Sequence, residues 1–303
     1  MVSKQARYFY NRGNSYRTLG KHLRAIEEYD KAIGLDPNEA AAYNNRGSSY
    51  DDLGRHRLAL EDYSKAISLD SKYAAAYYNR GNSYDAIGQY QRAIEDYDKA
   101  IELDSNDAEA HNNRGNCYRA LGQYQRAIED YETAIELSPI EALYFNNRGI
   151  VYRVLGLYQR SIEDYDKAIE LRPDAGRYFY NRGNSYRALG KYLRAIKDYD
   201  KAIELAPNEA AAYNNRGNSY RALGKHLLAI KDYDRAIELY PGVARYFNNR
   251  GDSYRALGKH RCAIKDYDKS IELDPNGSEA YTNRQTAVRA LEATTVDGCI
   301  GIQ

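Results

Sequence analysis

The triplet Asn-Arg-Gly returns every 34 residues along this 303-residue chain. It begins at Asn11 and recurs as far as Asn249, and a ninth copy, Asn283-Arg284, is followed by Gln285 in place of glycine. A fixed period of this length is typical of a solenoid, in which each supersecondary unit buries the face that its neighbour leaves open. The period therefore predicts one repetitive array that binds a partner, rather than two globular domains with catalytic sites.

Each 34-residue repeat is expected to be a hairpin of two helices. In the first repeat, Ala6–Glu39, apolar and aromatic residues recur at helical spacing in two blocks, 9–19 and 25–33. Gly20 follows the first block and is expected as a left-handed helix cap, with a glycine at the same position of every repeat. Tyr16 and Tyr29 and their counterparts are expected to fill the space between helices. All six prolines fall between a second helix and the next first helix.

The period also predicts the boundaries of the array. Residues 1–5 form an N-terminal extension, residues 278–293 a capping helix, and residues 294–303 a tail that is expected to be flexible. Gln285 and Val288 stand in the capping helix where glycine and tyrosine would pack against a following helix, so no further repeat is expected. The eight repeats span 6–39, 40–73, 74–107, 108–141, 142–175, 176–209, 210–243 and 244–277.

The arginine of the triplet has a matching acid in every second helix. One acid per arginine at a fixed spacing predicts ion pairs between the two helices of a repeat, and we favour this over a phosphate-binding stripe. The arginines are Arg12, Arg46, Arg80, Arg114, Arg148, Arg182, Arg216 and Arg250, with Arg284 in the last helix. The acids are Glu28, Asp62, Asp96, Asp130, Asp164, Asp198, Asp232 and Asp266.

This pattern resembles the tetratricopeptide repeat over residues 6–277. The matching residues of the first repeat are Phe9, Gly13, Tyr16, Leu19-Gly20, Ala25, Tyr29, Ala32 and Pro37. The resemblance implies an all-α fold, a right-handed superhelical solenoid of antiparallel helix pairs, in which first helices line a concave groove and second helices lie outside. The RNA-binding pentatricopeptide repeats are a related all-helical alternative, but the period and the proline position favour the tetratricopeptide repeat.

One face of each first helix carries asparagine. In the first repeat this face is Arg7, Asn11, Asn14 and Thr18, because residues spaced by four, three and four share a side of a helix. The position of Asn11 is asparagine in all eight repeats: Asn11, Asn45, Asn79, Asn113, Asn147, Asn181, Asn215 and Asn249. The position of Asn14 is asparagine in five: Asn14, Asn82, Asn116, Asn184 and Asn218.

An amide offers both a donor and an acceptor, so a row of amides can bind the backbone of an extended peptide without reading its side chains. The row is similar to the asparagine ladder in the tetratricopeptide superhelix of O-linked N-acetylglucosamine transferases. The alternative is that some of these asparagines bond to the adjacent helix or its loops. We predict that the row lines a peptide-binding groove of a non-enzymatic scaffold.

The predicted groove changes character along the chain. Asp51, Asp52 and Asp85 near the ends of early first helices give way to arginine at the same place later: Arg119, Arg153, Arg187, Arg221 and Arg255. Residues 74–141 carry 6 basic and 13 acidic residues, whereas residues 176–277 carry 19 and 12. This dipole could orient a charged partner, although drift among recent duplicates explains it equally well.

The fifth repeat differs from the others. Leu143, Ile150 and Val154 share the face of Asn147 and form a short apolar stripe. The stripe could anchor one apolar side chain of a ligand, or it could be extra packing with a neighbouring repeat. We predict an extended peptide with an apolar anchor over the fifth repeat and acidic residues over repeats six to eight.

Other classes of function are disfavoured. The lysines of the family's chaperone-tail carboxylate clamp are absent; Tyr10, for example, stands where the first is needed. Neither a cofactor nor a metal is expected, because the sequence contains no phosphate loop, nucleophile elbow or metal motif. His22, His56, His226 and His260 alternate with tyrosine at one position, which favours packing over metal binding.

The remaining predictions concern surroundings and partners. No run approaches the about 18 apolar residues of a membrane span. The absence of a signal peptide predicts a cytosolic protein, with the nucleus left open, and the three cysteines fit a reducing compartment. Nucleic-acid binding is disfavoured by the net charge of +1 and by the paired arginines. The alternative to a peptide-binding scaffold is a protein that self-associates by stacking the ends of its array.

Overall fold

The chain is an array of helices joined by tight turns. A computed structural model describes residues 4–297, with side chains up to residue 293. The first helices of the repeats are α1 (Lys4–Thr18), α3 (Ala40–Asp52), α5 (Ala74–Ala86), α7 (Ala108–Ala120), α9 (Ala142–Val154), α11 (Gly176–Ala188), α13 (Ala210–Ala222) and α15 (Ala244–Ala256). The second helices are α2 (His22–Leu35), α4 (His56–Leu69), α6 (Tyr90–Leu103), α8 (Tyr124–Leu137), α10 (Tyr158–Leu171), α12 (Tyr192–Leu205), α14 (His226–Leu239) and α16 (His260–Leu273), and α17 (Ser278–Asp297) comes last.

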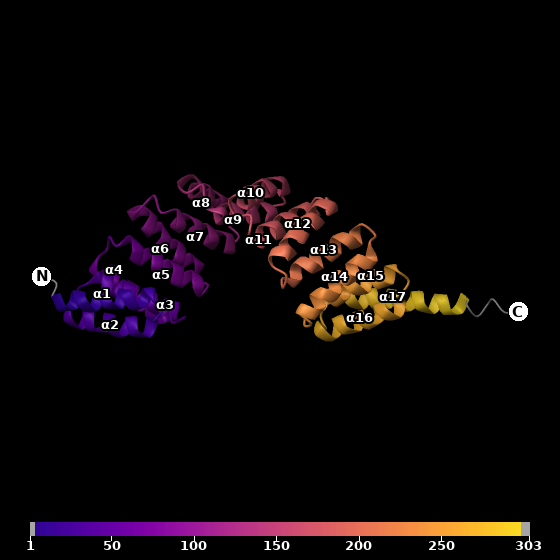
Figure 1. The fold of residues 1–303 in the computed structure, drawn as a ribbon, viewed down its shortest axis with the longest axis horizontal. Helices are drawn as coiled ribbons and strands as arrows, with labels where there is room; N and C mark the ends of the chain where they lie inside the picture. The colour runs from indigo at the N-terminus through magenta and orange to yellow at the C-terminus, as the bar shows by residue number, and fades with distance from the viewer. Residues whose placement is uncertain (1–3, 298–303) are drawn as a thin grey trace. The chain divides into compact units, whose positions relative to one another are not determined.

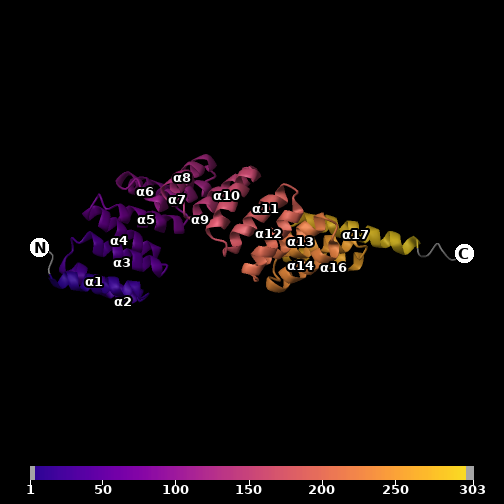
Figure 2. The ribbon, with the colours of Figure 1, turned by 45° about the horizontal axis from the view of Figure 1, so that its top comes forward.

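These helices form two compact halves, Met1–Val151 and Tyr152–Gln303, whose boundary lies within α9. In the N-terminal half, α1 to α8 form four antiparallel pairs stacked in chain order (Figures 1 and 2). In the C-terminal half, α11 to α16 form three such pairs, with α10 packed on α11 and α17 on α16. The fold is therefore the predicted all-α superhelical solenoid of antiparallel helix pairs.

A tyrosine in the middle of each second helix forms the core. Each of these eight rings is at most 1% exposed: Tyr29, Tyr63, Tyr97, Tyr131, Tyr165, Tyr199, Tyr233 and Tyr267. The ring lies against the glycine of the triplet, because a Cβ built on Gly13 would lie 2.6 Å from the Tyr29 ring. The counterparts of Tyr16 are only half-buried, apart from Tyr152 at 7% exposure. The prediction that both tyrosine positions fill the core is thus correct for the Tyr29 position and too strong for the other.

Each first helix ends in the predicted left-handed glycine. Gly20 has a φ of +68°, its N–H donates to the carbonyl of Arg17 at 2.9 Å, and the N–H of Lys21 donates to that of Tyr16 at 2.8 Å. This is a Schellman motif, which satisfies carbonyls at the helix end and turns the chain into the second helix. The seven counterparts have the same positive φ: Gly54, Gly88, Gly122, Gly156, Gly190, Gly224 and Gly258.

The arginine of the triplet pairs with the second-helix acid as predicted, and it also reaches the preceding repeat. Arg216 donates through Nε and Nη2 to Asp232 of its own repeat, at 2.9 and 2.6 Å, and through Nη1 to Asp200 of the previous one at 2.7 Å. Arg46, Arg114, Arg182 and Arg250 make the same three contacts with their own partners. The arginine therefore joins neighbouring hairpins as well as the two helices of one hairpin.

The last helix extends beyond its predicted end. It runs to Asp297, whereas the sequence pattern places its end near Ala293. Arg284 of this helix still pairs with Asp268 of α16, and Ala287 packs into the core with Tyr267. The rest of the predicted tail, residues 298–303, and residues 1–3 of the predicted extension lie outside the described residues.

Candidate binding surface of the first helices

The asparagines of the triplet bond to the preceding first helix by one of two patterns. Where the preceding helix has tyrosine one residue before its own triplet, the amide reaches two groups. Asn45 Nδ2 donates to Tyr10 Oη at 3.0 Å and to Asn14 Oδ1 at 2.9 Å. Asn113 and Asn215 make the same pair of bonds with their counterparts.

Where the residue before the triplet of the preceding first helix is asparagine, the triplet asparagine donates to the side-chain carbonyl of that residue. Asn79 Nδ2 donates to Asn44 Oδ1 at 3.0 Å, and Asn249 Nδ2 donates to Asn214 Oδ1 at 2.9 Å. Asn147 donates in the same way to Asn112 and is only 8% exposed. The triplet asparagines are thus first of all ties between neighbouring helices, a role that the sequence pattern assigned to only some of them. Asn11, at the start of the row, is exposed.

The asparagines three residues later hold the core tyrosine. Tyr233 Oη donates to Asn218 Oδ1 at 2.8 Å, and Tyr199 Oη donates to Asn184 Oδ1 at 2.8 Å. Asn14, Asn82 and Asn116 accept the corresponding tyrosine in their repeats. The carbonyl oxygen of each amide is therefore used within the fold, and its NH₂ group points away from that oxygen in the plane of the amide.

The arginine row differs from one repeat to the next. Arg153, Arg187 and Arg221 each have a buried Nε atom that lacks a hydrogen-bond partner. Arg221 Nη1 reaches Asp252 Oδ2 at 2.9 Å, and Arg255 Nη2 lies 3.8 Å from Asp252 Oδ1. Among the described residues, neither Arg153 nor Arg187 has a carboxylate within ion-pair distance.

A hollow of about 460 Å³ in the C-terminal half collects several of these residues. Its lining consists of Arg153, Tyr158, Tyr180, Asn181, Asn184, Arg187, Ala188, Asn215 and Arg245. Four of the predicted site residues, Asn181, Asn184, Arg187 and Asn215, thus meet in one place. The lining carries three arginines and no acid, so it is an electropositive recess.

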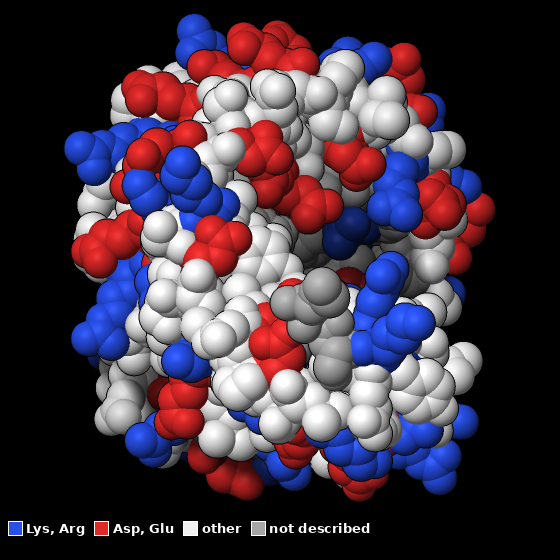
Figure 3. All heavy atoms as spheres, turned by 90° about the vertical axis from the view of Figure 1, so that its left-hand side faces the viewer, with Lys and Arg blue, Asp and Glu red and all other residues white. Residues whose placement is uncertain are grey.

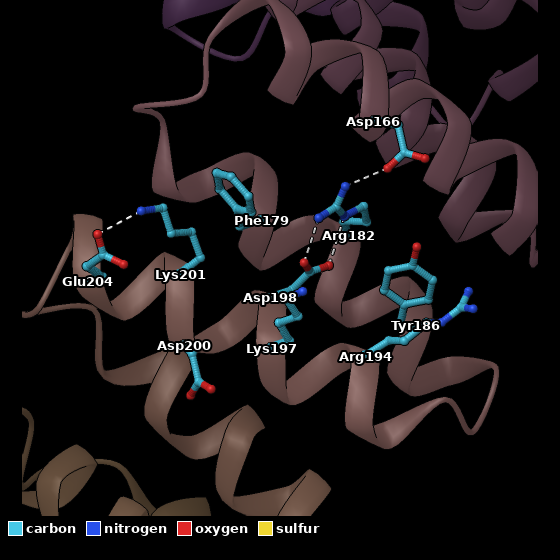
Figure 4. A pocket seen from close by; sticks show the side chains of 10 residues that line it. All are labelled: Asp166, Phe179, Arg182, Tyr186, Arg194, Lys197, Asp198, Asp200, Lys201 and Glu204. Carbon is cyan, nitrogen blue, oxygen red and sulfur yellow. Dashed lines mark hydrogen bonds and ion pairs between the residues drawn. The ribbon is translucent and has the colours of Figure 1, made fainter.

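A second hollow in the same half has balanced charges. It lies along α11 and α12, and Arg182 points between Asp166 and Asp198 in it (Figure 4). Lys201 pairs with Glu204 there, and Asp200 pairs with Arg216. Its four basic and four acidic side chains therefore neutralise one another, and the ion pairs explain the hollow as structural.

The acids predicted in the groove of the N-terminal half are engaged within the fold. Asp51 Oδ2 accepts from Tyr63 Oη at 2.9 Å and from Ser83 Oγ of the next repeat at 2.6 Å. Asp85 accepts from the buried Cys117, and burial raises the pKa of both Asp85 and the Cys117 thiol. These contacts between repeats were not predicted, because a serine or cysteine 32 residues away gives no recognisable signal.

The apolar stripe on α9 is partly accessible. Val154 is 50% exposed and Leu143 is 37% exposed, whereas Ile150 is half-buried. Ile150 stands where five other repeats have asparagine. Tyr165, the core tyrosine of this repeat, accordingly has a hydroxyl without a hydrogen-bond partner.

Other kinds of site find little support. Among residues 4–297, no group of three or more His, Cys, Asp or Glu side chains could hold a metal ion. His56 and His22 instead lie close to Asp51 and Asp52, at 3.0 and 3.1 Å. Within that same part of the chain, no helix is long and apolar enough to cross a bilayer. On the face shown in Figure 3, basic and acidic side chains are interspersed.

Comparison with known proteins identifies the repeat. Models of the tetratricopeptide repeat match residues 40–73, 74–107, 108–140 and 244–276, and a second model matches 146–210 and 180–244. A model described as the TPR repeat matches residues 13–54. No curated protein matches the chain.

Solved structures share the fold. The crystal structure of the APC/C hetero-tetramer Cut9–Hcn1 aligns with a TM-score of 0.65 and 19% identity over 88% of this chain, which spans about half (52%) of that protein. YrrB, described as a tetratricopeptide protein with an unusual peptide-binding site, aligns with a TM-score of 0.54 and 26% identity, over 63% of this chain and 99% of its own. A tetratricopeptide repeat protein from Parabacteroides merdae aligns with a TM-score of 0.63 and 21% identity, over 82% of this chain and 98% of its own.

The matched residues cover nearly all of the repetitive array, and each repeat has a glycine cap and a buried core tyrosine. Such arrays act as scaffolds for protein–protein interaction, because their stacked helices expose an extended surface. The chain therefore belongs to the tetratricopeptide repeat family.

Proposed function

We propose that the chain binds an extended segment of a partner protein along its first helices. The observation that carries this proposal is the orientation of the amides at the Asn14 position. In five repeats the carbonyl is used by a core tyrosine, which leaves the NH₂ group as a donor at the surface. Donors repeated at one per repeat suit the carbonyl groups of an extended backbone.

The triplet asparagines contribute in a second way. Asn79 and Asn249 each use one N–H for the preceding helix, so the other N–H and the carbonyl remain for a ligand. Asn45 uses both N–H groups and its carbonyl within the fold and serves mainly to hold the surface in shape. The proposed groove is therefore lined both by rigid ties and by available amides.

Charge and the α9 stripe supply the proposed specificity. The arginines of the C-terminal half favour acidic residues of the segment over repeats six to eight. The exposed Leu143 and Val154 favour an apolar anchor beside Ile150. YrrB, which is similar in fold, is itself described as having a peptide-binding site.

The test uses a library of unphosphorylated peptides on the immobilised chain. The variant Asn82→Asp/Asn116→Asp keeps the acceptors of Tyr97 and Tyr131 but removes the surface donors, so the fold is preserved. We expect it to weaken retention on the order of tenfold, as losing hydrogen bonds to a ligand does. The matched control is Arg92→Gln on the exposed side of α6, which should retain the same peptides.

The apolar anchor has its own variant. Ile150→Asp should remove peptides with a large apolar residue from the retained set while leaving the others. Equal retention by wild type, the double asparagine variant and the control would contradict the proposed groove. Loss of retention only in Ile150→Asp would restrict binding to the anchor.

A further inference from the structure

We infer that the electropositive recess of the C-terminal half binds a phosphoryl group carried by the bound segment. This inference rests on the proposed function and names the chemistry that one part of the groove recognises. The recess is lined by Arg153 at the end of α9, Arg187 at the end of α11 and Arg245 in the first turn of α15. Three first helices thus each contribute an arginine to the lining of one hollow.

The chain itself contains a carboxylate bound in this way. In the eighth repeat, Asp252 replaces the asparagine of the Asn14 position and lies between Arg221 and Arg255, at 2.9 and 3.8 Å. Its other contact, from Tyr267 Oη at 2.9 Å, is the one that asparagine makes elsewhere. The fold therefore accommodates an anion between two successive arginines of the row.

Two repeats earlier, the same positions are Arg153, Asn184 and Arg187. Here the middle residue is a neutral amide, so the two arginines line a hollow whose lining carries no negative charge. The third arginine, Arg245, lines the same hollow. A ligand anion would occupy the place that the Asp252 carboxylate fills in the eighth repeat.

The charge of the recess distinguishes between anions. A carboxylate brings one negative charge and two oxygens to three arginines. A phosphate monoester brings a charge of about −1.5 to −2 at neutral pH and three acceptor oxygens, so it matches the recess more closely. The Asn184 amide and the Tyr158 and Tyr180 rings, which also line the recess, fit a peptide main chain beside it.

The test compares three degenerate peptide pools that differ only in one fixed residue: phosphoserine, glutamate or serine. Fluorescence anisotropy with the full chain should show the phosphoserine pool binding on the order of tenfold more tightly than the glutamate pool. Inorganic phosphate should compete with the phosphoserine pool alone.

Asn184→Asp supplies the decisive variant. An aspartate there reproduces the arrangement of the eighth repeat. Its carboxylate should pair with Arg153 and Arg187 in place of a ligand anion, still accept the hydrogen bond from Tyr199, and abolish the preference for phosphoserine. Arg187→Gln should also reduce the preference. Arg194→Gln, which removes an arginine of α12 that stacks on Tyr186 outside the recess, is the matched control and should leave it unchanged.

The outcomes separate the two proposals. If all pools bind equally and the Asn82→Asp/Asn116→Asp variant still weakens them, the phosphoryl inference is wrong and the groove stands. If no pool binds, the proposed function fails with it. If a single-stranded oligonucleotide competes more strongly than the phosphoserine pool, the recess serves nucleic acid and the inference is overturned.

Discussion

The buried tyrosine of each second helix depends on two residues of the first helix. A glycine lets its ring approach the helix backbone, and in five repeats an asparagine accepts its hydroxyl. A large ring against a residue without a side chain gives close packing between two helices in a thin core. The same tyrosine orients the amide that we propose as a peptide donor, so packing and binding share one residue.

The glycine of this pair can be tested with a matched control. Gly47→Ala places a Cβ 2.8 Å from the ring of Tyr63 and should lower the free energy of unfolding by about 1–3 kcal/mol, as overpacking does. In Gly34→Ala, on α2, the new Cβ has no neighbouring atom within 4 Å, so this variant should raise the free energy of unfolding by about 0.5–1 kcal/mol. Urea denaturation of both variants measures the difference. Equal effects would contradict the close-packing role.

The hydroxyl can be tested by comparing two core tyrosines. Tyr233→Phe removes the bond to Asn218 and should cost about 1 kcal/mol of unfolding free energy. Tyr165→Phe removes a buried hydroxyl that has no partner, so its cost should be near zero or the variant more stable. Chemical denaturation distinguishes them. A cost for Tyr165→Phe as large as that for Tyr233→Phe would be inconsistent with the structure.

At the scale of the helix, the triplet arginine connects one hairpin to the next. In the repeats with a complete set of contacts, three donor groups of one guanidinium hold two carboxylates on successive second helices. The hydrogen bonds that Arg46 donates to Asp62 raise the pKa of Arg46, while burial raises the pKa of Asp62. The planar fork of arginine suits this double contact, and the compact charge of lysine does not.

Arginine-to-lysine substitution isolates that geometry. Arg216→Lys keeps the charge but cannot reach Asp232 twice and Asp200 once, so it should lower the free energy of unfolding by about 1–3 kcal/mol. Arg235→Lys alters an exposed pair with Glu238 and should change it by less than about 0.5 kcal/mol. Thermal and urea unfolding provide the comparison. A similar small effect at both sites would show that the bridge between hairpins adds nothing.

Across the whole molecule, the tyrosine core makes stability sensitive to high pH. Burial raises the pKa of Tyr29, Tyr131 and Tyr165 from 10.0 to about 12, and it raises that of the other five core tyrosines as well. Each ionises more readily in the unfolded chain than in the folded one. Their contribution is complete below pH 10 and is lost as the pH rises from about 10 through 12.

The melting temperature should therefore fall steeply above pH 10, and the core tyrosines should ionise only as the helices unfold. Tyrosinate absorbance and circular dichroism recorded together check this. Complete tyrosine ionisation with an intact fold would contradict the buried core.

The period and its small residues were enough to predict the helix pairs, the glycine caps and the arginine–acid pairs. Each of these depends on residues at a constant separation within one repeat, so the repetition makes the pattern visible. The end of α17 was misplaced, because a terminal helix has no neighbour in the sequence with which to compare its length.

The repeated sequence by itself determined the fold class, since every repeat must bury the same tyrosine face against the next. Only the tertiary structure decided which asparagines tie helices together and which present a donor. It also showed that Asp252 pairs with Arg221, whereas Arg153 and Arg187 meet in a recess without an acid. These distinctions depend on how the side chains of neighbouring repeats are oriented where they meet, and the sequence does not give that orientation.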